Sequence, residues 1–292
     1  MGEKHKRKLK VKIKPGMRVL SRSLEGNWNT IFKGRGMEFA GYRQYILGDD
    51  ARRIDWRASL RSNHILVKEL EEYHALNIFF LLDVSNSMMC SSTGQLKVEY
   101  ASELISNLSY NILRNGDATG LGLFSDKLVS KIYPEKGQGM QFRIMEELND
   151  SSNYGGNFNL SHALMVVNSF LEEGTMIIIV SDFIGLKENW ARYLKILSGK
   201  YEVIGIMIHD PRDYSMPNEP GQYLLENPYT KEKIYIDSIQ YASIYAKDVK
   251  KRIEFIKNVF EKSKMGFVYL KTDQDFEKPI VNYFKKRVIV TR

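Results

Sequence analysis

The chain has 292 residues, of which 43% are hydrophobic and 27% charged, so it can bury one large core or two small ones. Its formal net charge is +8 at pH 7, and its single cysteine, Cys90, has no partner for an internal disulfide. No apolar run approaches the roughly 18 to 20 residues that span a bilayer, and the first residues lack the apolar stretch of a secretory signal. These features argue against a secreted, disulfide-stabilised domain and favour a cytoplasmic protein.

The positive charge is concentrated at the start of the chain. Residues 1–14 contain seven lysines and arginines and one acid, Glu3, so this basic arm carries +6 and the rest of the chain only +2. Such an arm is either a solvated, frayed terminus or a contact for phosphates, lipid headgroups or an acidic partner. We expect no specific nucleic-acid recognition, because neither zinc-finger spacing nor an aromatic RNA-binding strand is present. Binding of nucleic acid through its phosphates, or peripheral contact with an anionic membrane through residues 4–14, stays open as an alternative function of the basic arm.

The next segment, residues 15–74, is rich in glycine and arginine. It mixes aromatic side chains, paired acids and arginines, and over much of its length it shows neither helical nor strand periodicity. Such a segment usually packs onto a neighbouring domain through specific side chains. We therefore expect an irregular or β-rich segment packed on the domain that follows.

After this segment, apolar runs of strand length alternate with segments of helical spacing. Three apolar runs are typical of strands buried on both faces: NIFFLLD (77–83), TMIIIVSD (175–182) and YEVIGIMIHD (201–210). The spacing of residues 96–115 is typical of an amphipathic helix. Repeated strand and helix units require right-handed crossovers and form a parallel sheet that helices cover on both faces. The sequence predicts a doubly wound, mainly parallel α/β domain over residues 75–292.

One stretch interrupts this alternation. Residues 211–237 contain four of the chain's seven prolines, and their QYLLE and KIYID runs flank the turn-rich NPYTK. Two short β-type runs around a turn predict an inserted hairpin.

The first predicted strand of the domain runs directly into FFLLDVSNSM, where Asp83, Ser85 and Ser87 occupy alternate positions. In a doubly wound sheet, ligands bind beyond the carboxyl ends of the strands. One carboxylate and two hydroxyls that face one point are hard oxygen ligands for Mg²⁺, Mn²⁺ or Ca²⁺. The alternative is a polar turn in which Ser85 or Ser87 caps the following helix.

Two later loops are expected near the same edge of the sheet. Asp182 ends a later strand just as Asp83 ends the first, and it offers a second carboxylate. Gly155, Gly156 and Asn157 precede a predicted helix; Asn157 or Asn159 either caps that helix or turns its amide oxygen toward the metal.

These residues carry a resemblance. DVSNSM after an apolar strand, with Asp182 at the end of a later one, resembles the metal-ion-dependent adhesion site of von Willebrand factor A-type domains. The upstream GRGMEFAGYRQYILGDDARRIDWRAS resembles the signature of the bacterial family called domain of unknown function 58. The matching positions are Gly36, Glu38, Phe39, Arg43, Tyr45, Gly48, Asp49, Asp50, Arg52, Ile54, Asp55 and Trp56.

The resemblance implies a metal site formed by Asp83, Ser85, Ser87 and Asp182. It departs from the A-type pattern at Asn157, which stands where such domains tend to have threonine. With few charged ligands, a site of this kind is expected to bind metal weakly, with a dissociation constant on the order of 10⁻⁴ to 10⁻³ M.

Family members lack a known enzymatic activity, and many are encoded beside MoxR-type AAA+ ATPases. The resemblance therefore implies an adaptor that works with such an ATPase. Within the signature block, the arginines, the acids and Trp56 either pair with one another and fix the segment in place or form a partner-binding surface.

The alternative to an adaptor is a metal-dependent enzyme. A phosphatase of the haloacid-dehalogenase type needs a second aspartate two residues after the first, and Ser85 occupies that position. The chain has no phosphate-binding loop of the P-loop type, no H-x-x-x-H spacing, no nucleophile elbow and no Cys/His pairing. We expect a non-enzymatic protein, with a divalent-metal-dependent hydrolase as the less favoured alternative.

Overall fold

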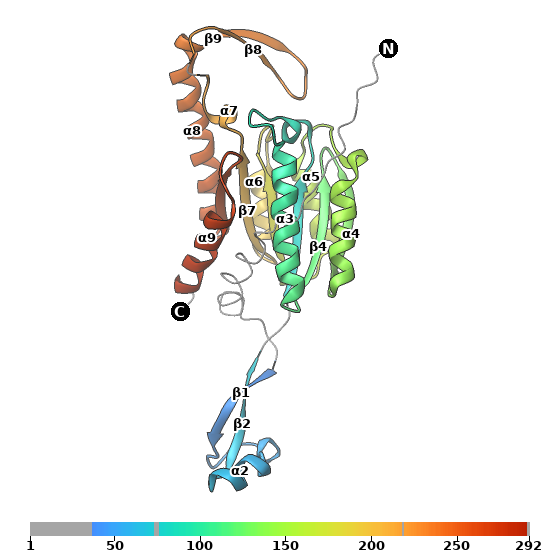
Figure 1. Cartoon of the computed structure of the whole chain (residues 1–292), viewed down its shortest axis with the longest axis vertical. Helices are drawn as coiled ribbons and strands as arrows, with labels where there is room; N and C mark the ends of the chain where they lie inside the picture. The colour runs from blue at the N-terminus through green and yellow to red at the C-terminus, as the bar shows by residue number, and fades with distance from the viewer. Residues whose placement is uncertain (1–36, 73–75, 218, 291–292) are drawn as a thin grey trace.

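The computed structural model describes residues 37–72, 76–217 and 219–290 (Figure 1). The basic arm of residues 1–14 lies outside the described residues. Among those that are described, no helix combines the length and the apolar character needed to cross a bilayer.

A six-stranded, mainly parallel sheet forms the centre of the molecule (Figure 1), and it confirms the predicted α/β class. Its order is β10-β7-β6-β3-β4-β5, and every pairing is parallel except that of the edge strand β5 with β4. Only three residues connect β4 to β5, too few for a crossover, so these strands pair as an antiparallel hairpin. The strands are β3 (Asn77–Asp83), β4 (Ala118–Phe124), β5 (Leu128–Glu135), β6 (Met176–Ser181), β7 (Glu202–His209) and β10 (Gly266–Lys271).

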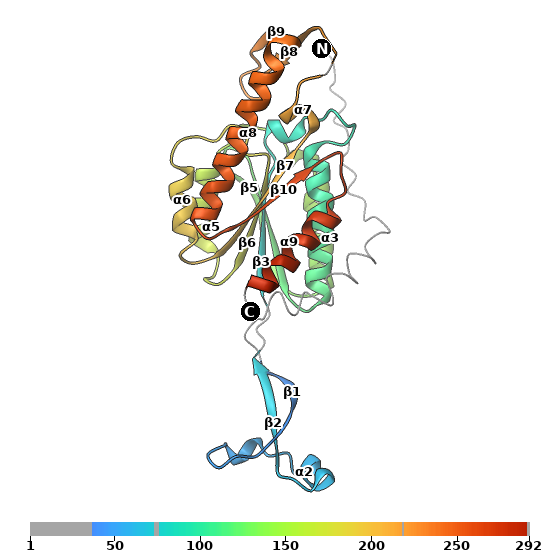
Figure 2. The same ribbon diagram turned by 90° about the vertical axis from the view of Figure 1, so that its left-hand side faces the viewer.

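Helices cover both faces of the sheet, as Figure 2 shows in side view. Ile78, Phe80 and Leu82 of β3 pack against α3, α4 and α9, whereas Phe79 and Leu81 pack against α5, α6 and α8. Because successive side chains of a strand point to opposite faces, the continuous apolar run of β3 supplies two separate cores. The helices are α3 (Lys97–Arg114), α4 (Gln138–Asn149), α5 (Leu160–Phe170), α6 (Trp190–Leu197), α8 (Ser238–Lys262) and α9 (Glu277–Val290).

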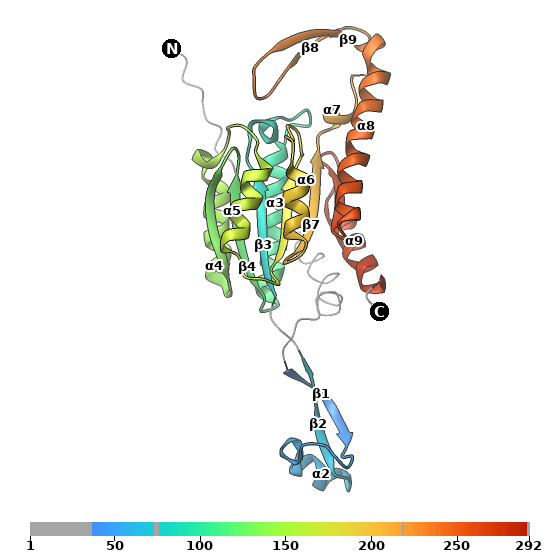
Figure 3. The ribbon, with the colours of Figure 1, turned by 180° about the vertical axis from the view of Figure 1, so that it is seen from behind.

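The predicted insertion is a hairpin that follows the short helix α7 (Pro211–Tyr214). Its strands β8 (Gln222–Glu226) and β9 (Lys233–Asp237) pair with each other and form a sheet of their own. Asp237 then caps α8 by accepting the backbone N–H of Ile239 at 2.8 Å. Figures 1 and 3 show the hairpin reaching from α8 across the end of the sheet.

The described part of residues 15–74 is a small unit of its own. It consists of the antiparallel strands β1 (Met37–Gln44) and β2 (Leu66–Glu72), the 3₁₀ turn η1 (Ala51–Arg53) and the short helix α2 (Trp56–Ser62). Figures 1 and 2 show this unit apart from the sheet, so the predicted packing onto the domain is not seen in the described part. Polar side chains of the unit bond one another, and Leu47, Trp56 and Leu60 are exposed.

Candidate functional site at the carboxyl end of the sheet

Two adjacent strands bring the predicted residues together. β3 ends at Asp83 and its parallel neighbour β6 ends one residue before Asp182, so both carboxylates emerge at the same edge. Asp83, Ser85 and Asp182 are completely buried, and Ser87 is 1% exposed. The backbone N–H of Ser85 donates to Asp83 Oδ1 at 2.9 Å, which turns the chain sharply after the strand.

The four oxygen-bearing side chains form a continuous hydrogen-bonded cluster. Ser85 Oγ lies 3.4 Å from Ser87 Oγ, and Ser87 donates to Asp182 Oδ1 at 3.1 Å. Ser181, at the end of β6, donates to Asp83 Oδ2 at 2.6 Å and so links the two strand ends. The spacing of the motif and the ends of the strands were therefore sufficient to find this cluster.

Asn157 is not part of the cluster. Its loop borders the site, because Gly155 N–H donates to Val84 O at 2.7 Å and Gly156 N–H to Asn86 Oδ1 at 3.1 Å. The Asn157 side chain is nevertheless exposed, and within the described part of the chain it makes no hydrogen bond to any of the four residues. The backbone of this loop, not the Asn157 amide, contacts the site. Asn159 caps α5 by accepting the N–H of His162 at 3.2 Å.

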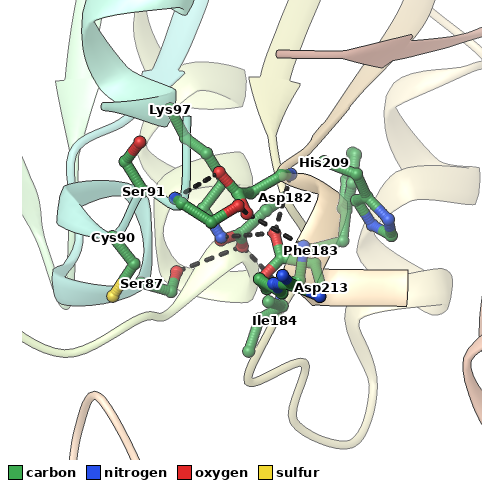
Figure 4. Close-up of polar contacts among 12 residues, drawn as sticks. Ser87, Cys90, Ser91, Lys97, Asp182, Phe183, Ile184, His209 and Asp213 are labelled. Atoms are coloured by element: carbon green, nitrogen blue, oxygen red, sulfur yellow. Dashed lines mark hydrogen bonds and ion pairs between the residues drawn. The ribbon is translucent and has the colours of Figure 1, made fainter. Parts of the chain in front are cut away.

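Lys97, which the sequence analysis missed, is a buried cation beside the cluster (Figure 4). Its ammonium lies 2.7 Å from Asp182 Oδ2 and 2.7 Å from Asp213 Oδ2. Burial alone would lower the pKa of Lys97, but the two carboxylates outweigh it and raise this pKa above its ordinary value. A signal existed, because Lys97 shares the helical spacing of Ala101, Leu104 and Leu108 on the buried face of α3.

The carboxylate of Asp83 has no such cation. Within the described residues it forms no ion pair, and its hydrogen bonds come from the Ser85 N–H and the Ser181 hydroxyl. Burial, reinforced by the nearby charge of Asp182, raises the pKa of Asp83 to about 7. The neighbouring imidazole of His209 adds no positive charge at neutral pH, because burial lowers its pKa to about 4.

Tyr229, also missed from the sequence, reaches the cluster from the turn between β8 and β9. Its hydroxyl oxygen lies 2.9 Å from Ser87 Oγ, 3.2 Å from Ser85 Oγ and 2.9 Å from the carbonyl oxygen of Ile184. The site is therefore made of two carboxylates, three hydroxyls at its centre and one ammonium at its edge.

These groups define what the site can do chemically. Carboxylates and hydroxyls are hard ligands that fit Mg²⁺, Mn²⁺ or Ca²⁺, whereas no group of three His, Cys, Asp or Glu residues among the described ones could hold a metal without the hydroxyls. In the described part of the chain, the hydroxyls of Ser85 and Ser87 bond each other, Tyr229 and Asp182, and neither bonds a histidine. The donor set fits ion binding and recognition.

Comparison with known proteins places the chain in a family. The family described as "Protein of unknown function DUF58" matches residues 41–253. The chain belongs to this family.

Curated relatives of this chain include uncharacterized proteins from mycobacteria. "Uncharacterized protein Mb1516" of Mycobacterium bovis is 24% identical over 206 residues, which are 70% of this chain and 64% of that protein. The chain thus spans less than two thirds of this relative's length. "Uncharacterized protein MAV169" of Mycobacterium avium is 30% identical over 114 residues, which are 38% of this chain and 66% of that protein.

Among solved structures, the chain is similar to the conserved hypothetical protein BatB of Bacteroides thetaiotaomicron, with a TM-score of 0.48 and 19% identity over 74% of this chain and 100% of that one. It is also similar to the SpRpn10 VWA domain, with a TM-score of 0.41 and 13% identity over 72% of this chain and 95% of that one. Both scores lie below 0.5, so the family assignment rests on the sequence match.

The signature residues from Glu38 to Trp56 lie in the β1–α2–β2 unit, away from the oxygen cluster (Figure 1), and Gly36 lies outside the described residues. Arg43 donates two hydrogen bonds to Asp49, at 2.6 and 2.7 Å. Asp50 and Asp55 cap η1 and α2, and Asp55 also accepts the Tyr42 hydroxyl at 3.0 Å.

The other signature residues divide between the backbone ladder and the surface. Tyr45 N–H donates to Ile65 O at 2.8 Å, whereas the side chains of Arg52 and Trp56 are exposed. The side chain of Glu38 lies outside the described residues. Most of the block thus builds the local structure of the unit, whereas the side chains of Arg52, which lies 3.8 Å from Asp50 Oδ1, and Trp56 face outward.

Proposed function

We propose that this chain is a non-enzymatic interaction module that binds a protein partner through a divalent metal at the carboxyl end of its sheet. One observation carries the proposal: Asp83 is a fully buried carboxylate beside a second one, with two hydroxyls in reach and no cationic partner among the described residues. Burying a charge without a counter-charge is costly, and a cation bound there would remove that cost.

Each residue of the cluster has a distinct role in the proposal. Asp83, Ser85 and Ser87 would hold the ion. Asp182 would orient Ser87 through its Oδ1, while Lys97 balances the charge of Asp182 at Oδ2. When bound, Mg²⁺ would supply positive charge and an open coordination position for an acidic side chain of the partner. Because Lys97 already balances one carboxylate, the site would bind a single ion weakly.

The partner that we propose is a MoxR-type AAA+ ATPase, with the chain acting as its adaptor in the cytoplasm during assembly, maturation or stress-related processes. The support for this partner is the resemblance of the chain to the DUF58 family. The adaptor role is also consistent with the described site, where neither serine bonds a histidine.

The test is capture of an AAA+ ATPase from the native host lysate by immobilised wild type and Asp83→Asn, with Mg²⁺ and with chelator. We expect the ATPase with wild type in Mg²⁺ only. Asp126→Asn is the matched control, because Asp126 is an exposed carboxylate at the end of β4 that lies outside the cluster. Equal capture under all conditions would remove the metal from the mechanism, and capture of no AAA+ ATPase would remove this partner.

A further inference from the structure

The turn between β8 and β9 is built to present one side chain. Asn227 Oδ1 accepts the backbone N–H of Tyr229 at 2.9 Å and that of Thr230 at 3.2 Å, and Lys231 N–H donates to Asn227 O at 3.0 Å. An asparagine that bonds its own backbone in this way stiffens the turn. Tyr229 therefore points from a rigid tip and not from a loose loop.

The tip docks where the serine hydroxyls meet. Besides its contacts with Ser85, Ser87 and the Ile184 carbonyl, the ring of Tyr229 lies close to Gly185. A Cβ at Gly185 would come within 2.9 Å of Tyr229 Cε2, so only glycine allows the ring this close. The phenol thus covers the position from which a partner's side chain would approach the two serines.

The rest of the hairpin is held far less. Within the described residues, the hydrogen bonds that join β8, β9 and their turn to the end of the sheet are those of Tyr229. Beneath β8 is a groove of about 390 Å³ that Met216, Leu224 and Tyr245 help to line. A two-stranded hairpin alone is marginally stable in water, so its order depends on the docked tip.

We propose that Tyr229 is an intrachain occupant of the partner's position, and that the β8–β9 tip must lift before an acidic group of a partner can reach the Ser85–Ser87 site. This inference rests on the proposed function, because it names what competes with the partner at the same site. In the closed state the hydroxyl of Tyr229 bonds both serines and stands in the position of the partner's carboxylate, with or without a bound ion; in the open state that position is free for the partner.

The chemistry of the two groups favours replacement of the Tyr229 hydroxyl by a carboxylate of the partner. The side chain of Tyr229 is a phenol, which is neutral in its ordinary protonated form. A neutral phenol is a weaker ligand for a hard cation than a carboxylate is, so an acidic partner displaces it once an ion is present. The closed state is then the resting state, and the partner's apparent affinity is reduced by the fraction of molecules that are open.

The test compares wild type with Tyr229→Phe, which keeps the ring and removes only the hydroxyl. The matched control is Tyr223→Phe in the same hairpin, whose hydroxyl donates to Glu219 O at 3.1 Å, away from the site. The first measurement is hydrogen exchange of the β8–β9 amides without metal. We expect exchange to be roughly tenfold faster in Tyr229→Phe, because the hydroxyl that bonds Ser85, Ser87 and the Ile184 carbonyl is lost, and unchanged in Tyr223→Phe. Equal exchange in Tyr229→Phe and wild type would overturn the inference.

The second measurement is the water-proton relaxation produced by Mn²⁺ bound to each protein. We expect Tyr229→Phe to raise the enhancement per bound ion by about one coordinated water, which takes the position that the phenol leaves. Asp83→Asn should lose the binding. An enhancement equal to that of wild type would contradict occupation of that position by Tyr229. If neither wild type nor Tyr229→Phe binds Mn²⁺, the metal in the proposed function is wrong, while hydrogen exchange still decides whether Tyr229 closes the site.

Discussion

At the scale of single residues, Lys97 is the cation on which the buried acids depend. Its ammonium is 1% exposed and bridges Asp182 and Asp213. Replacing it by methionine leaves these buried carboxylates without a counter-charge, so we expect Lys97→Met to lower the free energy of unfolding by about 3 to 5 kcal/mol in urea titrations. Lys195→Met, at an exposed position of α6, should change it by less than about 0.5 kcal/mol. Equal effects of the two substitutions would contradict the role of Lys97.

Asp83 should make stability depend on pH in metal-free protein. Its pKa is about 7 in the folded chain, against about 4 for an unfolded aspartate, so the folded state holds the proton to higher pH. The contribution of Asp83 to the free energy of unfolding therefore falls as pH rises from about 4 to about 7. The nearby charge of Asp182 strengthens this effect, and the hydrogen bonds from Ser181 and Ser85 weaken it. The lowered pKa of His209 acts in the opposite direction, so the effect of Asp83 is measured as a difference from a variant.

Asp83→Asn keeps the shape of the side chain but has no such proton to lose. Relative to wild type in chelator, we expect this variant to gain about 2 to 4 kcal/mol between pH 4 and 7, measured by urea unfolding at several pH values. Asp126→Asn should run parallel to wild type. A constant difference between Asp83→Asn and wild type across this range would refute the assignment.

The sequence identified Asp83, Ser85, Ser87 and Asp182 because a strand end fixes where each side chain emerges. Lys97 was within reach, since a charged residue stood at an apolar position of a helix. Tyr229 was not, because its contact with Ser87 joins residues 142 apart and depends on how the inserted hairpin leans over the sheet. The role of Asn157 as a ligand stays a prediction; in the structure its side chain is exposed and its loop meets the site through backbone groups.

At the scale of elements, β7 and α8 meet through a glycine. A Cβ at Gly205 would lie 2.5 Å from Cζ of Phe260, which is completely buried, so Gly205→Ala must push α8 away from the sheet. We expect a loss of about 1 to 3 kcal/mol in the free energy of unfolding, with partial recovery in the double variant Gly205→Ala/Phe260→Leu.

Gly139→Ala in α4 is the matched control, because nothing lies within 4 Å of its added Cβ. We expect this change to stabilise the protein by about 0.5 to 1 kcal/mol, since alanine favours the helix. A destabilised Gly139→Ala, or a neutral Gly205→Ala, would count against close packing as the cause.

The order of strands and helices followed from the alternation of apolar runs and helical spacing, because elements buried on both faces leave a strong pattern. The structure of the Met37–Glu72 unit could not be predicted in this way. Its side chains stabilise turns, cap helices and form local ion pairs, and they do not form one apolar face. The position of the unit relative to the sheet is a long-range property, and no local sequence pattern encodes it.

At the scale of the whole molecule, the sheet domain and the β1–α2–β2 unit should unfold separately. Both apolar cores are built from residues 78–284, and neither includes a described residue of the unit. We expect Ile178→Ala, in the centre of β6, to speed hydrogen exchange across the sheet by the equivalent of about 2 to 5 kcal/mol while exchange in β1 and β2 stays unchanged. Equal acceleration in both parts would show that they fold as one.

The oxygen cluster and the two residues beside it, Asp213 and Tyr229, come from distant parts of the sheet domain and are brought together only by the folded sheet and its hairpin. During synthesis, the first carboxylate leaves the ribosome long before the last hydroxyl does, and long-range contacts of this kind form late. The cluster is consequently assembled after most of the domain. Any protein that binds there distinguishes a finished molecule from a partly folded one.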